Sequence, residues 1–152
     1  MEKYLFQYCQ KIVVFSKDKK KVLLCKRKGE RDYDGVFSFI GGKMETSDKD
    51  ILAALKREKT EEVGKDFRIN LYPEYSTNLL FIKKDGNYMI LPHYLAIHIS
   101  GEINLNEKYS EYKWVSIDSL EHFEPKIPGI PGIVKKLIEL MKIADENDFV
   151  EI

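Results

Sequence analysis

Three glutamates are crowded into one short segment that has the composition of a helix. Glu58, Glu61 and Glu62 stand three and four residues apart within ALKREKTEEVG, residues 54–64. At these spacings, like charges destabilise an isolated helix by a few tenths of a kcal/mol for each pair. We therefore expect that something in the folded protein offsets the repulsion.

The three acidic residues continue the apolar face of the same helix. With a turn of about 100° per residue, Ile51, Ala54 and Leu55 fall on one stripe, and the glutamates follow on that stripe. Lys59 falls at its flank. The carboxylates are therefore predicted to point toward the sheet. The alternatives are solvated glutamates on an ordinary charged helix and an acidic protein-interaction surface.

Converging carboxylates need a compensating charge. On a partly enclosed site they repel one another and lose hydration unless protons or a hard cation compensate. A divalent ion is the simplest compensation. Since the ligands would be oxygen atoms and no cluster of cysteine and histidine accompanies them, the donor set favours Mg²⁺ or Mn²⁺ over zinc.

Length and composition indicate one folded domain. The chain has 152 residues, 43% hydrophobic and 33% charged, and we expect a single domain over residues 1–152. The formal net charge of +0 predicts no nucleic-acid partner. No apolar run is long enough to cross a bilayer and no signal peptide is recognisable, which predicts no membrane partner and a cytoplasmic location. In that reducing compartment, Cys9 and Cys25 are expected to be buried thiols.

Short β-rich runs dominate the first forty residues. Strands are predicted over three ranges: 11–15, 21–27 and 36–40. The first two form a hairpin pattern, and the third leads into a pair of glycines. A helix is predicted to begin near Ser47 or Asp48, either of which can cap it, and to end at Gly64.

The second half of the chain adds more strands and a second helix. Strands are predicted over four ranges: 67–72, 77–84, 87–99 and 113–117. Asp85-Gly86 is a strong hairpin signal, and Pro92 predicts an edge position or a bulge. A short helical turn around 119–123 and an amphipathic helix from Pro131 complete the pattern. The sum is an α/β fold in which a mixed sheet and at least two helices pack as layers.

Residues 41–64, GGKMETSDKDILAALKREKTEEVG, resemble the Nudix box of the MutT-like hydrolases. In that box a glycine is followed by a spaced acidic residue and then by an Arg-Glu, apolar, any, Glu-Glu, any, Gly series. The segments 57–58 and 61–64 match the second half without a gap. In the first half, Asp48 stands for the acidic residue that contacts the arginine and braces the loop, and one residue is inserted before Ala54.

The resemblance extends more weakly over most of the chain. LLCKR at 23–27 and SEYKWVSIDSL at 110–120 look like the second strand and a late segment of the family. Lys59 departs from the pattern, because its position in the box is usually apolar. The resemblance implies a Nudix-type α/β/α sandwich with a central mixed β-sheet.

An activity and a set of site residues follow from the same resemblance. It implies a Mg²⁺-dependent pyrophosphohydrolase, for which Mn²⁺ could substitute. This enzyme would cleave a nucleoside triphosphate, or another nucleoside diphosphate linked to a group X, by water attack at phosphorus. Glu58, Glu61 and Glu62 would supply the metal ligands or, for one of them, accept a proton. Gly41 would add its backbone carbonyl as a ligand, and Arg57 would orient the glutamates.

Two further positions are candidates for the site. An acidic residue from a late loop often completes such a site in the family, and either Glu107 or Glu111 could supply it here; each could equally be an ordinary loop residue. Arg27 lies at a strand end, where an arginine can grip a phosphate, although it could also be a plain surface arginine.

The remaining histidines and aromatic residues are interpreted as structural. His93 and His98 lie five apart on one predicted strand and so face opposite sides. Several aromatic residues could stack on a base but are expected to lie in the core: Tyr33, Phe37, Phe39 and Tyr94.

The range of candidate substrates is narrowed by the substrate-specific motifs that the sequence lacks. Downstream of the box it shows none of the motifs of the ADP-ribose, diadenosine polyphosphate and NADH types. A nucleoside triphosphate, including a damaged one, or a nucleotide sugar remains. The alternative is a non-catalytic Nudix-like module that senses a nucleotide. The expected partner is a small nucleotide, and a homodimer is compatible with the sequence.

Overall fold

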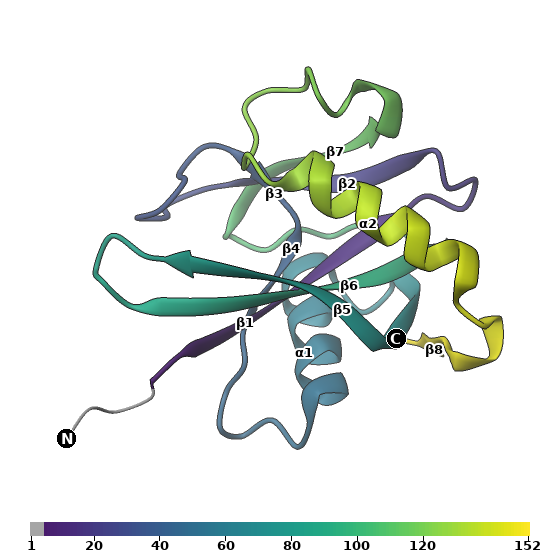
Figure 1. Cartoon of the computed structure of the whole chain (residues 1–152), viewed down its shortest axis with the longest axis horizontal. Helices are drawn as coiled ribbons and strands as arrows, with labels where there is room; N and C mark the ends of the chain where they lie inside the picture. Colours follow the sequence, from purple (N-terminus) through teal and green to yellow (C-terminus); the bar gives the residue numbers. More distant parts are fainter. Residues whose placement is uncertain (1–4) are drawn as a thin grey trace.

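A computed structural model describes residues 5–152, which fold as one eight-stranded sheet covered by a helix on each face (Figure 1). The expected α/β/α sandwich around a mixed sheet is confirmed. The elements, in chain order, are β1 (Gln7–Phe15), β2 (Lys21–Arg27), β3 (Phe37–Ser38), β4 (Ile40–Lys43), α1 (Ile51–Val63), β5 (Arg68–Ile82), β6 (Tyr88–Ser100), β7 (Tyr109–Ser116), α2 (Ile130–Ile143) and β8 (Val150–Glu151). Short 3₁₀ turns span Ile117–Ser119 and Glu146–Asp148.

The strand order places β4 beside β1. The main path runs β3-β2-β1-β6-β5-β8, with β7 paired to β2. Among the named strands of residues 5–152, β1 and β6 form the one parallel pair. In the described chain, β1 and β2 share one pair, Phe15 with Val22, after which β2 diverges. The antiparallel strand β4 then lies along β1, with Gly41 opposite Lys11. This pairing carries the two glycines of the expected box onto the sheet.

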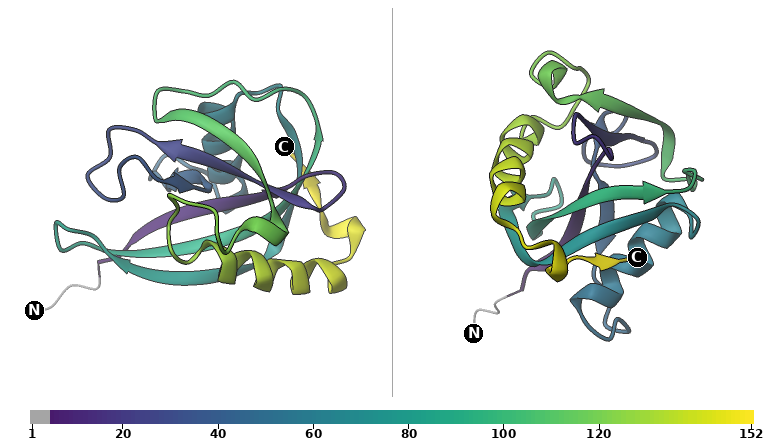
Figure 2. Two further views of the ribbon diagram at one scale, coloured as in Figure 1. Left: turned by 90° about the horizontal axis from the view of Figure 1, so that it is seen from above. Right: turned by 90° about the vertical axis from the view of Figure 1, so that its right-hand side faces the viewer.

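Two hydrophobic cores lie on the two faces of the sheet (Figure 2). Along β1 the side chains alternate, because successive residues of a strand point to opposite faces. Ile12 and Val14 pack in the cluster beneath α1, whereas Val13 and Phe15 pack in the cluster beneath α2. Burial on both faces explains the uninterrupted apolar run of this strand.

Helix α1 begins later than predicted. Asp50 is the N-cap, and its Oδ1 accepts a hydrogen bond from the N–H of Ala53 at 2.8 Å. The sequence suggested Ser47 or Asp48, but the carboxylate of Asp48 is bound by Arg57 and by the N–H of Glu45. The helix ends before Gly64, whose φ of 95° suits a residue without a side chain, as expected.

Pro92 lies in the interior of the sheet, so the prediction of an edge or a bulge there is wrong. It is buried in β6, which lies between β1 and β5. The β1–β6 ladder passes from the Tyr8–Ile90 pair to the Lys11–His93 pair without a change of register, and Pro92, which has no N–H, is skipped between them. The irregularities of the β5–β6 ladder lie instead in β5, between Arg68 and Ile69 and between Tyr72 and Ser76.

The other predicted elements need small changes. The ranges 67–72 and 77–84 join as the single strand β5, which forms the expected hairpin with β6. The short helical turn lies at Ile117–Ser119, two residues before the predicted range, and α2 begins at Ile130, as predicted to within one residue. Cys9 and Cys25 are both free and buried. Within residues 5–152, no helix is long and apolar enough to cross a membrane.

Candidate active site

Helix α1 presents two of its three glutamates to the sheet. Its buried residues follow one stripe, namely Ala54, Leu55, Glu58, Lys59, Glu62 and Val63. Glu58 is 3% exposed and Glu62 is fully buried, as the periodicity predicts. The side chain of Glu61, by contrast, is 50% exposed at the rim. Lys59, predicted at the flank, lies on the stripe and is buried, whereas Ile51 is exposed.

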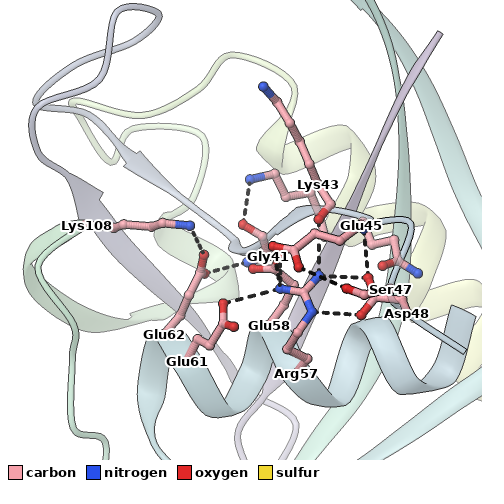
Figure 3. Close-up of polar contacts among 12 residues, drawn as sticks. Gly41, Lys43, Glu45, Ser47, Asp48, Arg57, Glu58, Glu61, Glu62 and Lys108 are labelled. Atoms are coloured by element: carbon pink, nitrogen blue, oxygen red, sulfur yellow. Dashed lines mark hydrogen bonds and ion pairs between the residues drawn. The ribbon is translucent and has the colours of Figure 1, made fainter.

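Glu62 is held by one of its two oxygens. Its Oε1 accepts the N–H of Gly41 at 2.8 Å and the hydroxyl of Tyr109 at 2.7 Å. Its Oε2 is buried and accepts no hydrogen bond from residues 5–152, although Lys108 Nζ lies 3.6 Å away (Figure 3). Burial and the carboxylate of Glu62 raise the pKa of Tyr109, so this phenol remains a donor.

Glu58, like Glu62, has one carboxylate oxygen with a hydrogen-bond partner in residues 5–152 and one without. Its Oε1 lies 3.0 Å from Nη1 of Arg57, while its Oε2 is buried and unpaired within the described chain. Burial raises the pKa of Glu58, and the neighbouring charge of Glu62 raises it further, against the opposing effect of Arg57. Each of these two glutamates therefore has one buried carboxylate oxygen that accepts no hydrogen bond from the described chain.

The paired glycines allow two close approaches, one to Glu58 and one to the backbone of β1. A Cβ built on Gly42 would collide with the carboxylate of Glu58, and a Cβ on Gly41 would collide with the backbone carbonyl of Gln10. Gly41 also has φ of 131°, which side chains rarely adopt. The carbonyl of Gly41, the expected backbone ligand, lies 3.5 Å from Lys11 Nζ.

Arg57 connects the loop before α1 to the glutamates (Figure 3). It binds Asp48 through two hydrogen bonds, Nε to Oδ1 at 2.8 Å and Nη2 to Oδ2 at 2.9 Å. The same guanidinium contacts Glu58 at 3.0 Å and Glu61 at 3.3 Å, and it donates to the carbonyl of Lys43 at 3.2 Å. The contact with Asp48 persists despite the inserted residue, and Arg57 is placed to orient the glutamates.

A cavity of about 550 Å³ opens over these residues. Both paired glycines and all three glutamates line it. Basic side chains from five different parts of the chain also line it, namely Lys11, Arg27, Lys43, Lys83 and Lys108. Partial burial and the neighbouring ammonium of Lys83 lower the pKa of Lys43. Ammonium groups gathered around carboxylates form a site suited to a polyanion accompanied by a cation.

The structure brings only some of the other predicted residues to the cavity. Arg27 lines it, and its Nη2 donates to the carbonyl of Asp32 at 3.1 Å. The cavity formed by residues 5–152 is lined by neither Glu107 nor Glu111, and Glu111 instead faces Lys26 at 3.9 Å. The late loop does reach the site, but through Lys108 and Tyr109.

The lysines and the tyrosine of this cavity were not identified as site residues by the sequence analysis. Lys43 directly follows the paired glycines, and Lys83 stands two residues after Phe81 on the same face, so both were within reach of pattern arguments. Lys108 and Tyr109 adjoin the predicted acidic residues, but only the strand pairing of β7 with β2 shows which side chains turn inward.

The donor set fits a hard divalent cation. Among residues 5–152, no three His, Cys, Asp or Glu side chains already converge in the manner of a metal site. Two buried carboxylate oxygens that accept no hydrogen bond within the described chain, one on Glu58 and one on Glu62, nevertheless face the cavity, with Glu61 at its rim. Oxygen ligands of this kind suit Mg²⁺ or Mn²⁺.

The residues interpreted as structural are mostly buried. His93 is buried with its Nδ1 2.9 Å from the carbonyl of Leu91, and burial lowers its pKa to about 4. His98 packs against Phe67 on the other face. Of the four aromatic residues expected in the core, three are buried, whereas Tyr33 is 42% exposed and the expectation for it is wrong.

The NUDIX domain model matches residues 9–137, which is most of the chain. The chain belongs to the Nudix family. Members of this Nudix hydrolase family are pyrophosphohydrolases, so the expected class of enzyme is confirmed. The nucleoside triphosphatase NudI of Escherichia coli O139:H28 (strain E24377A / ETEC) is 27% identical over 117 residues, covering 67% of this chain and 77% of the relative. NudI of Shigella flexneri matches equally well.

Solved Nudix structures share the fold. The MutT protein from Methanosarcina mazei Go1 superposes with a TM-score of 0.74 at 16% identity, covering 93% of this chain and 99% of the other. The NUDIX domain of Shewanella oneidensis NrtR, complexed with ADP ribose, gives 0.71 at 17% identity, covering 91% and 90%. A C. elegans Ap4A hydrolase gives 0.72 at 16% identity, covering 90% and 98%.

Lys59 is the feature of this Nudix box that departs most from the family pattern. Its ammonium donates to the carbonyls of Phe67 at 2.9 Å and Gly64 at 3.3 Å, just beyond the end of α1. Burial lowers its pKa. A lysine at a usually apolar position is therefore accommodated because its long stem is buried and its ammonium donates to two backbone carbonyls of the segment that follows the helix.

Proposed function

We propose that this Nudix protein hydrolyses a nucleoside triphosphate, by water attack at phosphorus, with Mg²⁺ or Mn²⁺ as its cofactor. The observation that carries the proposal is a pair of buried oxygens, one on Glu58 and one on Glu62, that accept no hydrogen bond from the described chain and face a cavity whose other wall is basic. Two such carboxylates repel each other unless a cation lies between them. Another nucleoside diphosphate linked to a group X, such as a nucleotide sugar, is the nearest alternative substrate.

The three glutamates divide the work at the cation. Glu58 and Glu62 would hold it through the oxygens that accept no hydrogen bond from the described chain, and Glu61 would reach it from the rim. The N–H of Gly41 and the hydroxyl of Tyr109 fix the orientation of Glu62. One of the three carboxylates would accept the proton of the attacking water. Arg57 holds Glu58 and Glu61 in place, and the carbonyl of Gly41 is a further candidate ligand.

The bound divalent cation would neutralise phosphate charge and lower the pKa of the attacking water.

The basic residues of the cavity favour a triphosphate. Lys43 and Lys83 lie close enough to lower the pKa of Lys43, and an anion between them would relieve this repulsion. Arg27 and Lys108 are placed at other points of the same wall. A chain of three phosphates carries more negative charge than a diphosphate and can engage more of these side chains at once. The name nucleoside triphosphatase carried by NudI supports the same substrate class.

A nucleotide panel tests the proposal. Wild type is incubated with nucleoside triphosphates and nucleotide sugars in Mg²⁺, and the release of phosphate or pyrophosphate is measured. We expect turnover by wild type and a loss of at least about 100-fold in kcat for Glu62→Gln, because the variant removes a charge that acts on the transition state.

Glu74→Gln is the matched control, because Glu74 is an exposed glutamate on β5 that does not line the cavity. It should retain full activity. If wild type and Glu62→Gln both bind nucleotides and neither turns over any substrate, the protein is a nucleotide sensor and the hydrolase proposal is wrong.

Other properties of the protein stay predictions. We propose that residues 1–152 act as a single domain, since both helices pack on one continuous sheet. A cytoplasmic location is supported by the two free, buried thiols. A homodimer is compatible with the sequence, and light scattering after gel filtration would measure the oligomeric state.

A further inference from the structure

A second hollow adjoins the phosphate cavity. It has a volume of about 610 Å³ and lies between the loop that joins β2 to β3 and the tip of the β5–β6 hairpin. Asp32 and Phe81 line both hollows, so the two are neighbours. Figure 1 shows this loop and the hairpin projecting from the same end of the molecule.

Two aromatic rings form the wall of the second hollow. The rings of Tyr33 and Phe81 have centroids 5.9 Å apart and planes inclined by 40°. Tyr33 is 42% exposed and Phe81 is half-buried. Because the rings are tilted rather than stacked, and that of Tyr33 is partly exposed, they leave aromatic surface open to a flat ligand.

The loop that carries Tyr33 is fixed on both sides. The Nη2 of Arg27 donates to the carbonyl of Asp32 at 3.1 Å, and the N–H of Lys84 donates to Oδ1 of Asp32 at 3.1 Å. Tyr33 itself has φ of 53°, a conformation that an aromatic residue adopts only when its surroundings impose it. The exposed ring is therefore presented by a braced loop.

Arg27 links the two hollows. It lines the phosphate cavity and also braces the backbone of the residue before Tyr33. A ligand with its phosphates among the cations would thus extend past Asp32 toward the two rings. A nucleotide has this form, with a polyanion at one end and a flat aromatic base at the other.

We infer that Tyr33 and Phe81 form the nucleobase subsite of this enzyme, on which the base of the substrate stacks while its phosphates occupy the adjoining cavity. The inference rests on the proposed function. Stacking on an aromatic ring tolerates any base, since every base has a π-face. The subsite therefore selects nucleotides over phosphoanhydrides that lack a base and discriminates weakly among the bases.

Binding without turnover provides the first test. In EDTA, calorimetry compares guanosine monophosphate with ribose 5-phosphate, which shares its sugar and phosphate but lacks the base. We expect wild type to bind the nucleotide at least about 10-fold more tightly, and Tyr33→Leu or Phe81→Leu to remove most of this preference. Tyr33→Trp should preserve it, and the melting temperature of each variant checks that it folds.

Tyr75→Leu is the matched control. Tyr75 is an exposed tyrosine on β5 that packs against Tyr72 and lines neither hollow, so its loss should leave the preference unchanged. Equal affinity of wild type for the two ligands would overturn the inference. So would an equal loss of affinity for both ligands in the Tyr33 and Phe81 variants.

Turnover provides the second test and separates the two proposals. The ratio of kcat/KM for guanosine triphosphate to that for inorganic tripolyphosphate should exceed about 10 in wild type and fall about 10-fold in Tyr33→Leu, mainly through KM. A wild-type protein that prefers the nucleotide in EDTA but hydrolyses nothing would keep the subsite and refute the hydrolase. Equal kcat/KM for guanosine triphosphate and tripolyphosphate would support the proposed hydrolase activity and refute the nucleobase subsite.

Discussion

Asp48 and Arg57 form an ion pair beside the site. The pair is bidentate, and the Asp48 side chain is only 5% exposed. Planar guanidinium and carboxylate groups fix each other's orientation through two parallel hydrogen bonds. The loop that precedes α1 is therefore tied to the helix at the residue that also contacts Glu58 and Glu61.

The titration of Asp48 should be visible in the acid stability of the protein. Arg57, together with the N–H of Glu45, lowers the pKa of Asp48 from 3.8 to about 2. A carboxyl whose pKa falls on folding stabilises the protein above its unfolded pKa, and that contribution is lost as the pH falls toward the folded value. Melting temperatures of wild type and Asp48→Asn should therefore differ most above pH 4 and converge between pH 4 and pH 2. A difference that stays constant over this range would contradict the assignment.

Periodicity predicted the two most buried acidic residues but not their neighbours. Glu58 and Glu62 lie on the line that Ala54 and Leu55 define. Glu61 lies about 70° to one side of that line and is half exposed. Lys59 lies about 90° to the other side, which predicts a position at the flank, and only the carbonyls beyond the helix end explain why the burial of this ammonium is tolerated.

At the scale of elements, the approach of β4 to α1 decides the position of Glu58. The carboxylate lies so close to Gly42 that a methyl group there would overlap it. The pairing of β4 with β1 prevents the strand from moving away, because Gly41 on the same strand already contacts the backbone of Gln10. The glutamate side chain must therefore yield to any substitution at Gly42.

Gly42→Ala should consequently impair activity more than stability. The new methyl group would displace the carboxylate of Glu58, and a displacement of about 1 Å in a catalytic group can cost about 100-fold in rate. We expect a loss of this size in kcat/KM for the best nucleotide of the panel, with the melting temperature within a few degrees of wild type.

Gly132→Ala is the control for that variant. Gly132 lies in α2, and no heavy atom of the described chain lies within 4 Å of an added Cβ. Alanine there should leave activity unchanged and stabilise the helix by up to about 1 kcal/mol. Full activity of Gly42→Ala would show that Glu58 has no fixed role in turnover.

The positions of the strands could be predicted from the sequence more reliably than the pairing of one strand with another. The hairpin at Asp85-Gly86 and the amphipathic pattern of α2 are local signals, and both are confirmed. Pro92 led to a wrong prediction because the strands on either side of it in the sheet are set by long-range pairing. Its missing N–H is tolerated where β1 and β6 skip a pair, which no local pattern reveals.

At the scale of the whole molecule, the site depends on segments that are distant in the sequence. Lys11, Lys43 and Lys83 come from β1, from β4 and from just beyond β5, and Lys108 immediately precedes β7. The glutamates could be predicted because they share one helix. The basic wall could not, because its members meet only through the order of strands in the sheet.

Without a bound cation, the repulsion between the carboxylates of Glu58 and Glu62 should lower the stability of the folded protein. Glu58 and Glu62 are both buried, and the charge of Glu62 raises the pKa of Glu58. In Glu62→Gln the amide oxygen can still accept the N–H of Gly41 and the hydroxyl of Tyr109, so the variant removes charge while keeping both hydrogen bonds. In EDTA its melting temperature should equal or exceed that of wild type.

Adding Mg²⁺ should reverse that order. A ligand at 100 times its dissociation constant stabilises the folded state by about 2.7 kcal/mol, and each kcal/mol shifts the melting temperature of a chain of this size by about 2–4 °C. Wild type should therefore melt several degrees higher in saturating Mg²⁺ than in EDTA, whereas Glu62→Gln should respond much less because it has lost a charged ligand. Thermal unfolding of both proteins in each buffer measures the effect. Equal shifts in the two proteins would mean that Mg²⁺ binds elsewhere, and the carboxylates of α1 would then need another partner to explain their burial.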